Sequence, residues 1–255
     1  MATTPAIAGV PSAGWVPAPT PLTLMPALAG ALGVDALWVK RDDALTGPVS
    51  GNHDGRPPAF FGGTKVRKLD ALFAQEPWRG ADAVVSIGAI GSGHLVACAS
   101  AARLLGKRFS AHIFDEPMTD GVADNLLWTV RCAHEIWWHR GRVAMGLRAP
   151  GALWGQRWRG HVLIPPGASN AAGTLGTLRG GVELGEQLLA LDGAAARPVE
   201  RVYVCLGSGG TVAGLALGLA VAFARADASA RLPRVVAVTA VERVFTPRAA
   251  LDGPT

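Results

Sequence analysis

Short apolar runs alternate with amphipathic stretches along most of the chain. The runs are rich in Val, Ile and aromatic residues and predict strands at residues 36–40, 83–87, 109–114, 135–138, 161–164, 202–206 and 234–239. Apolar residues at helical spacing separate them and predict helices over residues 24–32, 65–74, 92–105, 122–133, 143–154, 171–189 and 211–225. Strands that alternate with helices are typical of parallel sheets with crossover connections, so the predicted fold class is α/β.

A glycine pair stands immediately before the second predicted helix. Gly62 and Gly63 are followed by Thr64 and Lys65, and a Gly/Pro/Asn-rich stretch at residues 47–58 precedes them and is expected to form an exposed loop. Glycine lets backbone approach a ligand closely, and an amine placed there can form a Schiff base with a carbonyl cofactor. A loop-to-helix junction with a solvated lysine explains the same residues, so this stretch alone leaves both interpretations open.

The clearest anion-binding pattern follows the strand at residues 202–206. Gly207, Ser208, Gly209, Gly210 and Thr211 end that strand and open a helix, which directs backbone N–H groups and the positive helix end at one spot. A dinucleotide fingerprint would need glycine at position 212, where valine stands, and a P-loop would need a lysine before the Ser/Thr. A phosphate held by backbone amides, Ser208 and Thr211 is therefore preferred over a turn that merely needs glycine.

A second glycine-bounded loop follows the strand at residues 83–87. It leads into Ser92, Gly93 and His94, at the start of a predicted helix. Such a loop can bind a carboxylate through its N–H groups, with Ser92 as helix cap or donor and His94 in the first turn. An ordinary N-cap serine and first-turn histidine are the alternative.

Two further stretches carry residue types that bind ligands. Residues 165–170 contain Gly167, Ser169 and Asn170 before a long predicted helix, and a capped helix start is the favoured interpretation. Residues 135–159 combine several Trp residues with five arginines, a mixture that can bind single-stranded nucleic acid. An apolar strand and helix face with solvated arginines, at a subunit contact, is favoured there.

Composition narrows the function classes. Hydrophobic residues make up 49% of the chain and charged residues 17%, yet no apolar run is long enough to span a membrane. The net charge of +5 comes from scattered basic residues and fits a small anionic ligand as well as nucleic acid. Neither a membrane nor a nucleic-acid partner is expected, and no metal-binding motif is found.

The cysteines and the N-terminus point to a reducing compartment. Cys98, Cys132 and Cys205 are widely spaced, and Cys98 and Cys205 stand in apolar sequence, so buried free thiols are expected. The first residues are rich in Pro, Ala and Thr and lack the basic and apolar segments of a signal peptide, so the expected location is cytoplasmic.

Taken in order, these motifs resemble the fold-type II pyridoxal-phosphate enzymes of the tryptophan synthase beta-like superfamily. The resemblance is closest to the family of 1-aminocyclopropane-1-carboxylate deaminase and D-cysteine desulfhydrase. It rests on residues 19–22, 39–43, 62–69, 86–94 and 207–211, which cover most of the chain.

The resemblance implies a cofactor, a site and a fold. Lys65 would form the Schiff base with pyridoxal 5′-phosphate (PLP) and carry protons, and Gly207, Ser208, Gly209, Gly210 and Thr211 would hold the cofactor phosphate. Ser92, Gly93 and His94 would face the substrate carboxylate and the cofactor ring. The implied fold is two wound parallel-sheet domains: an incomplete larger, PLP-binding one from residues 1–68 and 170–255, and a smaller one from residues 69–169.

The implied activity is a PLP-dependent lyase or deaminase that acts on a small amino acid, in a homodimer. Gly93 and the expected lack of the family's C-terminal part favour an alternative, a truncated or catalytically impaired PLP-fold protein that serves as a binding or partner-dependent module. Gly93 and Thr64 stand where the family usually has Asn. Residues 47–58 resemble an insertion, and the chain is expected to lack the family's C-terminal part, with its tyrosine near the substrate.

Overall fold

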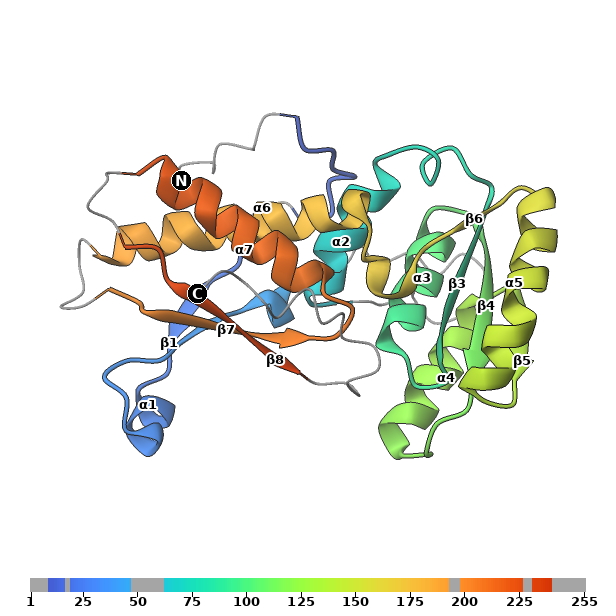
Figure 1. The fold of residues 1–255 in the computed structure, drawn as a ribbon, viewed down its shortest axis with the longest axis horizontal. Coiled ribbons are helices and arrows are strands. Elements are labelled where there is room, and N and C mark those ends of the chain that lie inside the picture. Colours follow the sequence, from blue (N-terminus) through green and yellow to red (C-terminus); the bar gives the residue numbers. More distant parts are fainter. Residues whose placement is uncertain (1–8, 17–18, 47–61, 193–197, 227–230, 240–255) are drawn as a thin grey trace.

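The computed structural model describes residues 9–16, 19–46, 62–192, 198–226 and 231–239. Its elements form two groups joined by helix α2 (Thr64–Phe73), as Figure 1 shows. One group is built around a four-stranded sheet, and the other around two long helices that lie beside a two-stranded sheet. Both of these sheets are parallel, so the predicted α/β class is confirmed.

The larger sheet contains β3 (Ala83–Ala89), β4 (Arg108–Phe114), β5 (Glu135–His139) and β6 (His161–Leu163), in the order β5-β4-β3-β6. Three helices connect these strands: α3 (Gly93–Leu104), α4 (Asp120–Cys132) and α5 (Arg142–Trp158). In Figure 1, α3 and α4 lie on one face of the sheet and α5 on the other. The carboxyl ends of parallel strands meet at one edge of a sheet, so the loop after β3 opens at an edge where ligands commonly bind.

Burial of apolar side chains stabilises this sheet between its helices. Val84, Phe109 and Ile113 on the strands and Leu95 on α3 are fully buried in one cluster. Full burial of such a side chain contributes about 1.5–3 kcal/mol, which explains why β3 and β4 read as nearly continuous apolar runs.

The second group packs α6 (Ala171–Asp192) against α7 (Gly210–Ala224), beside β7 (Arg201–Leu206) and β8 (Arg234–Thr239). Glycines let the two helices approach closely. A Cβ at Gly218 would overlap the carbonyl oxygen of Leu178, and one at Gly181 would lie 2.6 Å from the carbonyl oxygen of Leu215. Val182 and Leu219 fill the contact and are buried.

The N-terminal part of the described chain forms β1 (Leu22–Leu24), helix α1 (Pro26–Leu32) and β2 (Trp38–Lys40), with β1 antiparallel to β2. Short 3₁₀ turns follow at Asp42–Ala44 and, before α6, at Pro166–Ala168. Helix α2 lies between the two groups, and every residue from 66 to 73 is buried.

Most predicted elements are present, with a few differences. Strand β1 was not predicted, because its three residues form a strand only through pairing with β2. Helix α5 runs four residues beyond the predicted end at residue 154. The expected loop at residues 47–58 lies outside the described residues, and the domain boundaries after residues 68 and 169 stay predictions.

The prediction for one of the cysteines is wrong. Cys98 and Cys132 are buried free thiols, but Cys205 is exposed. The strand β7 pairs with only β8 among the described strands, and its residues 201, 203 and 205 are exposed on one side. Alternation along a strand therefore turns Cys205 outward in spite of its apolar neighbours.

Candidate active site

Lys65 lies in the first turn of α2, directly after a glycine that the backbone requires. Gly63 precedes the helix with φ of 72°, a value that favours glycine over other residues. A Cβ placed on Gly93, at the start of α3, would lie 3.8 Å from both Cε and Nζ of Lys65. The fold thus brings the predicted lysine next to the predicted carboxylate loop.

The predicted phosphate loop opens helix α7. Gly209 has a left-handed φ of 85° and the helix begins at Gly210, so its first-turn N–H groups have no acceptor within the helix. A Cβ on Gly210 would lie 2.7 Å from Ser169 Oγ and 3.0 Å from Lys68 Nζ. The hydroxyl oxygens of Ser208 and Ser169 are 2.6 Å apart. Hydroxyls, N–H groups without an acceptor inside the helix and an ammonium group therefore converge on one spot, which suits an anion.

Lys68 is a buried cation that the sequence did not single out. It is 5% exposed and donates to the carbonyl of Gly167 at 2.9 Å and to Ser169 Oγ at 3.2 Å. Burial, and secondarily the charge of Lys65, lowers the pKa of Lys68 to about 8. The sequence could have indicated Lys68 through its position three residues after Lys65, because residues three apart on a helix lie on the same face.

The segment before α6 forms the other wall of this anion site. Asn170 accepts a hydrogen bond from the N–H of Gly173 at 2.9 Å, so it caps the helix as the sequence predicts. Gly167 has a φ of 68°, and a Cβ there would overlap Ser208 Oγ. The segment that caps α6 therefore also shapes the contact between Ser169 and the phosphate loop.

A cavity of about 460 Å³ joins the lysines to the phosphate loop. The lining residues relevant to the site are Thr64, Lys65, Lys68, Ser208, Gly209 and Thr211. Ser92, Gly93 and His94 do not line it, although Gly93 lies against Lys65. The structure thus assembles the lysine and phosphate motifs in one cavity, and the roles of these residues stay predictions.

His94 is directed into the protein interior. It is 9% exposed, and its Nε2 lies 2.9 Å from Ser86 Oγ. Ser86 donates its own proton to the carbonyl of Ile164 at 2.8 Å, so His94 Nε2 carries a proton and donates it to Ser86. Burial, followed by the charges of Lys65 and Lys68, lowers the pKa of His94 to about 4.

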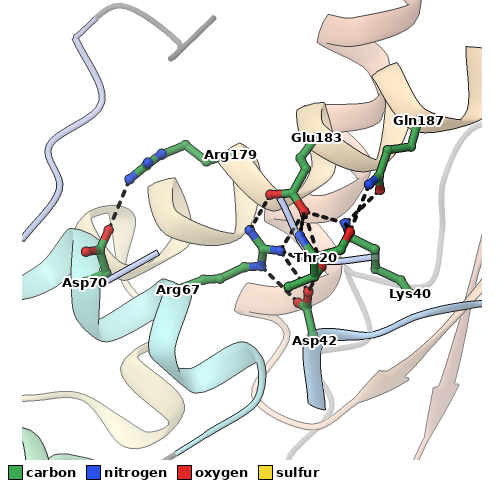
Figure 2. Close-up of polar contacts among 8 residues, drawn as sticks. All are labelled: Thr20, Lys40, Asp42, Arg67, Asp70, Arg179, Glu183 and Gln187. Carbon is green, nitrogen blue, oxygen red and sulfur yellow. Dashed lines mark hydrogen bonds and ion pairs between the residues drawn. The ribbon is translucent and has the colours of Figure 1, made fainter. Parts of the chain in front are cut away.

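A buried cluster of charged side chains fixes α2 against α6, as Figure 2 shows. Arg67 donates to Asp42 at 2.8 Å and to both carboxylate oxygens of Glu183, at 2.8 and 2.9 Å. Lys40 also contacts Glu183, and Thr20 donates to Asp42 at 2.8 Å. Because Arg67 is two residues after Lys65, this cluster restrains the turn of α2 that carries the lysine.

The charges of that cluster stabilise one another in spite of their burial. Burial alone would raise the pKa of the Glu183 carboxyl, but its hydrogen bond and charge interaction with Arg67, and then those with Lys40, hold the pKa below its usual range. The sequence gives no sign of this pairing, since Arg67 and Glu183 are 116 positions apart. A second pair from the same two helices, Arg179 with Asp70 at 3.0 Å, is visible in Figure 2.

Comparisons with a family model and with individual proteins identify the same family. The family model described as pyridoxal-phosphate dependent enzyme matches residues 16–251. A Pyrococcus abyssi protein bearing the name 1-aminocyclopropane-1-carboxylate deaminase is 35% identical over 210 residues, which cover 81% of this chain and 58% of that protein. D-cysteine desulfhydrase of Klebsiella pneumoniae is 32% identical over 238 residues, which cover 87% of this chain and 66% of that protein.

Solved structures agree with the fold. The crystal structure of a 1-aminocyclopropane-1-carboxylate deaminase homologue aligns with a TM-score of 0.71 at 25% identity, over 98% of this chain and 70% of that one. Maize serine racemase aligns with a TM-score of 0.58 at 20% identity, over 86% and 55% of the two chains, which shows a shared fold. The chain spans 58% and 66% of the length of the two curated relatives named above.

Proposed function

The chain belongs to the family of pyridoxal-phosphate dependent enzymes, and from that premise we propose that it is a PLP-dependent lyase or deaminase. Its substrate would be a small amino acid, as in 1-aminocyclopropane-1-carboxylate deaminase or D-cysteine desulfhydrase. The observation that carries the proposal is the single cavity lined by Lys65 and by Ser208, Gly209 and Thr211 of the phosphate loop.

The residues present fit the cofactor. Its phosphate needs a compact anion site, and the opening turn of α7, Ser208, Ser169 and Lys68 supply N–H, hydroxyl and ammonium donors around one point. Gly210 leaves room there, because a side chain would collide with Ser169 and approach Lys68. The aldehyde of the cofactor needs an amine, and Lys65 supplies it from the same cavity.

Each residue has a distinct task in this proposal. PLP, when bound, supplies a carbonyl for an amine and an electron sink for a carbanion next to nitrogen. Lys65 would hold the cofactor through its amine, and its Nζ would accept or donate a proton at the substrate. Ser92 and the N-terminus of α3 bind the substrate carboxylate, and His94, which is neutral at pH 7, supports that loop through Ser86.

Cofactor binding by Lys65 can be tested with the purified chain and added PLP. Wild type should develop the visible absorbance of a Schiff base, and borohydride should fix the cofactor to the protein. Lys65→Ala should give neither result, while Lys107→Arg, at a lysine that contacts the carbonyls of Arg79 and Ala81, should behave as wild type. The same spectrum for wild type and Lys65→Ala would disprove the assignment.

A second candidate is a PLP-fold protein that binds the cofactor without turnover. Gly93 favours it, because a residue without a side chain stands against Lys65 where the family usually places Asn. Turnover distinguishes the candidates: ammonia released from 1-aminocyclopropane-1-carboxylate or sulfide from D-cysteine by the 255-residue chain would exclude the binding module. Absorbance with PLP but no turnover of either compound would favour it.

A further inference from the structure

Helix α5 exposes a stripe of apolar side chains that includes both of its tryptophans. Val143 is 79% exposed, Leu147 80%, Trp154 65% and Trp158 78%. At about 100° per residue, these four positions fall within a sector of about 60° on the helix. A helix of a globular protein usually turns such a stripe toward the core, and an exposed apolar patch marks an interaction surface.

Buried contacts on the opposite side fix this orientation. Ala149 and Gln156 are 3% and 1% exposed and face the sheet. The side-chain amide of Gln156 donates to Glu135 at 3.2 Å, and its side-chain oxygen Oε1 lies 3.0 Å from His112 Nε2. These hydrogen bonds link α5 to β4 and β5, so the apolar stripe cannot turn inward without leaving buried polar groups unpaired.

Arginines border the stripe along both long edges. Arg157 flanks it on one side and Arg148 and Arg159 on the other, and all three are exposed, whereas the guanidinium of Arg142 lies over the Phe114 ring of β4. The chain has no Asp or Glu between residues 136 and 182, so α5 itself carries basic side chains and no acidic ones. Figure 1 places α5 at one end of the molecule, away from α6 and α7.

We propose that the stripe of Val143, Leu147, Trp154 and Trp158, with the three bordering arginines, docks on an anionic phospholipid membrane surface. Tryptophan prefers the interface of a bilayer, where the ring is buried and its N–H remains hydrated. Arginine extends to the headgroup level and binds phosphate with two parallel hydrogen bonds. The arrangement is that of a helix lying in the membrane plane, and among the described residues no helix is long and apolar enough to cross a bilayer.

Other occupants fit the stripe less well. A second copy of this chain would place arginines against arginines along both edges of the contact. A single-stranded nucleic acid would satisfy the arginines and stack on the two tryptophans, but Val143 and Leu147 offer no ring for a base and would stay exposed. A bilayer buries all four apolar residues and meets the arginines on both sides, so we depart from the expectation of no membrane partner.

Vesicle flotation tests the proposal with the full chain. At low salt the protein should float with vesicles of phosphatidylglycerol and phosphatidylcholine and not with vesicles of phosphatidylcholine alone. Trp154→Ala combined with Trp158→Ala should lower the partition coefficient on the order of tenfold or more. Arg148→Gln combined with Arg157→Gln should lower it by about fivefold for each arginine.

A matched control uses exposed leucines at a different place in the fold. Leu28 and Leu32 on α1 are 45% and 61% exposed, and replacing both by Ala should leave flotation unchanged. Circular dichroism would establish that each variant folds. Absence of flotation, equal flotation of wild type and the double Trp variant, or binding to a single-stranded oligonucleotide without flotation would each overturn the proposal.

Discussion

At the scale of single residues, the anion site depends on a lysine buried among hydroxyls and carbonyls. Among the described residues, the hydrogen-bond partners of Lys68 are the carbonyl of Gly167 and the hydroxyl of Ser169, and neither is a carboxylate. A buried ammonium group that contacts only neutral acceptors is costly. An anion bound at the opening of α7 would compensate that charge, which is why a phosphate site accounts for Lys68.

Replacing Lys68 by Met should weaken binding of PLP on the order of 10-fold to 100-fold, because one charge-assisted hydrogen bond to phosphate is lost. Binding of pyridoxal, which has the aldehyde but no phosphate, should change little. The measurement is a spectroscopic titration of both compounds against wild type and variant. An equal loss for pyridoxal and PLP would contradict a contact between Lys68 and the phosphate.

The difference in PLP affinity between wild type and Lys68→Met should depend on pH, because the pKa of Lys68 is about 8. Below pH 8 the free protein carries the Lys68 charge, and above it the charge is lost. The advantage of wild type over Lys68→Met for PLP should therefore shrink as the pH rises above 8. If the ratio of the two PLP affinities stayed constant between pH 7 and about pH 10, the charge of Lys68 would not be the one that binds PLP.

His94 should make stability depend on pH below neutrality. Its folded pKa of about 4 lies below the ordinary value of 6.5, so the unfolded chain takes up a proton first as the pH falls. The contribution of His94 is fully present above pH 6.5 and is lost as the pH falls toward 4, by a total on the order of 3 kcal/mol.

The variant His94→Gln isolates this effect, because Gln keeps an N–H near Ser86 but does not titrate. Urea denaturation should show that the free energy of unfolding of wild type falls more steeply than that of the variant between pH 6.5 and 4. Burial also lowers the pKa of His112, His139 and His161, and the comparison cancels their contribution. Parallel pH profiles would mean that His94 is not the group responsible.

At the scale of elements, the contact between α6 and α7 determines where the phosphate loop lies. Gly218→Ala should destabilise the protein by about 2 kcal/mol, because the new Cβ would overlap the carbonyl oxygen of Leu178 in α6. Helix propensity alone favours alanine over glycine by roughly 0.5–1 kcal/mol, so the sign of the change identifies the packing effect.

The matched control is Gly146→Ala on α5, where a Cβ would meet nothing within 4 Å. This substitution should stabilise the protein by roughly 0.5–1 kcal/mol. Both variants can be compared by urea denaturation. Stabilisation by both substitutions would show that α6 and α7 separate easily, and the proposed rigid support for the phosphate loop would be wrong.

At the scale of the whole molecule, the cluster around Glu183 joins segments that are far apart in the sequence. Removing its charge in Glu183→Gln leaves Arg67 and Lys40 buried without that partner, and we expect a loss of about 3 kcal/mol of unfolding free energy. Asp43→Asn breaks the exposed pair with Arg41 and should leave the free energy of unfolding almost unchanged, because solvent screens that pair.

The cofactor spectrum provides a second measurement for Glu183→Gln. Because Arg67 is two residues after Lys65, loosening the cluster should weaken PLP binding as well as stability, whereas Asp43→Asn should leave the spectrum unchanged. If Glu183→Gln and Asp43→Asn lowered the free energy of unfolding equally, the buried cluster would stabilise the position of α2 no more than an exposed ion pair does.

The sequence by itself determined the elements and the local motifs. Alternation of apolar runs and helical spacing is a property of neighbouring residues, so the α/β class and most element positions followed from it. The glycines before Lys65 and in the loop that opens α7 were also recognisable, because φ values such as 72° at Gly63 and 85° at Gly209 are local requirements.

Only the tertiary structure decided which distant residues meet and which way side chains face. Lys68 lies in the anion site because α2 packs against the segment before α6. The packing of α2 also brings Arg67 into contact with Glu183. Cys205 and the apolar face of α5 are exposed because of what covers each element, which no local pattern encodes. Contacts across long stretches of chain depend on the packing of whole elements, whereas periodicity and turn chemistry depend on residues a few positions apart.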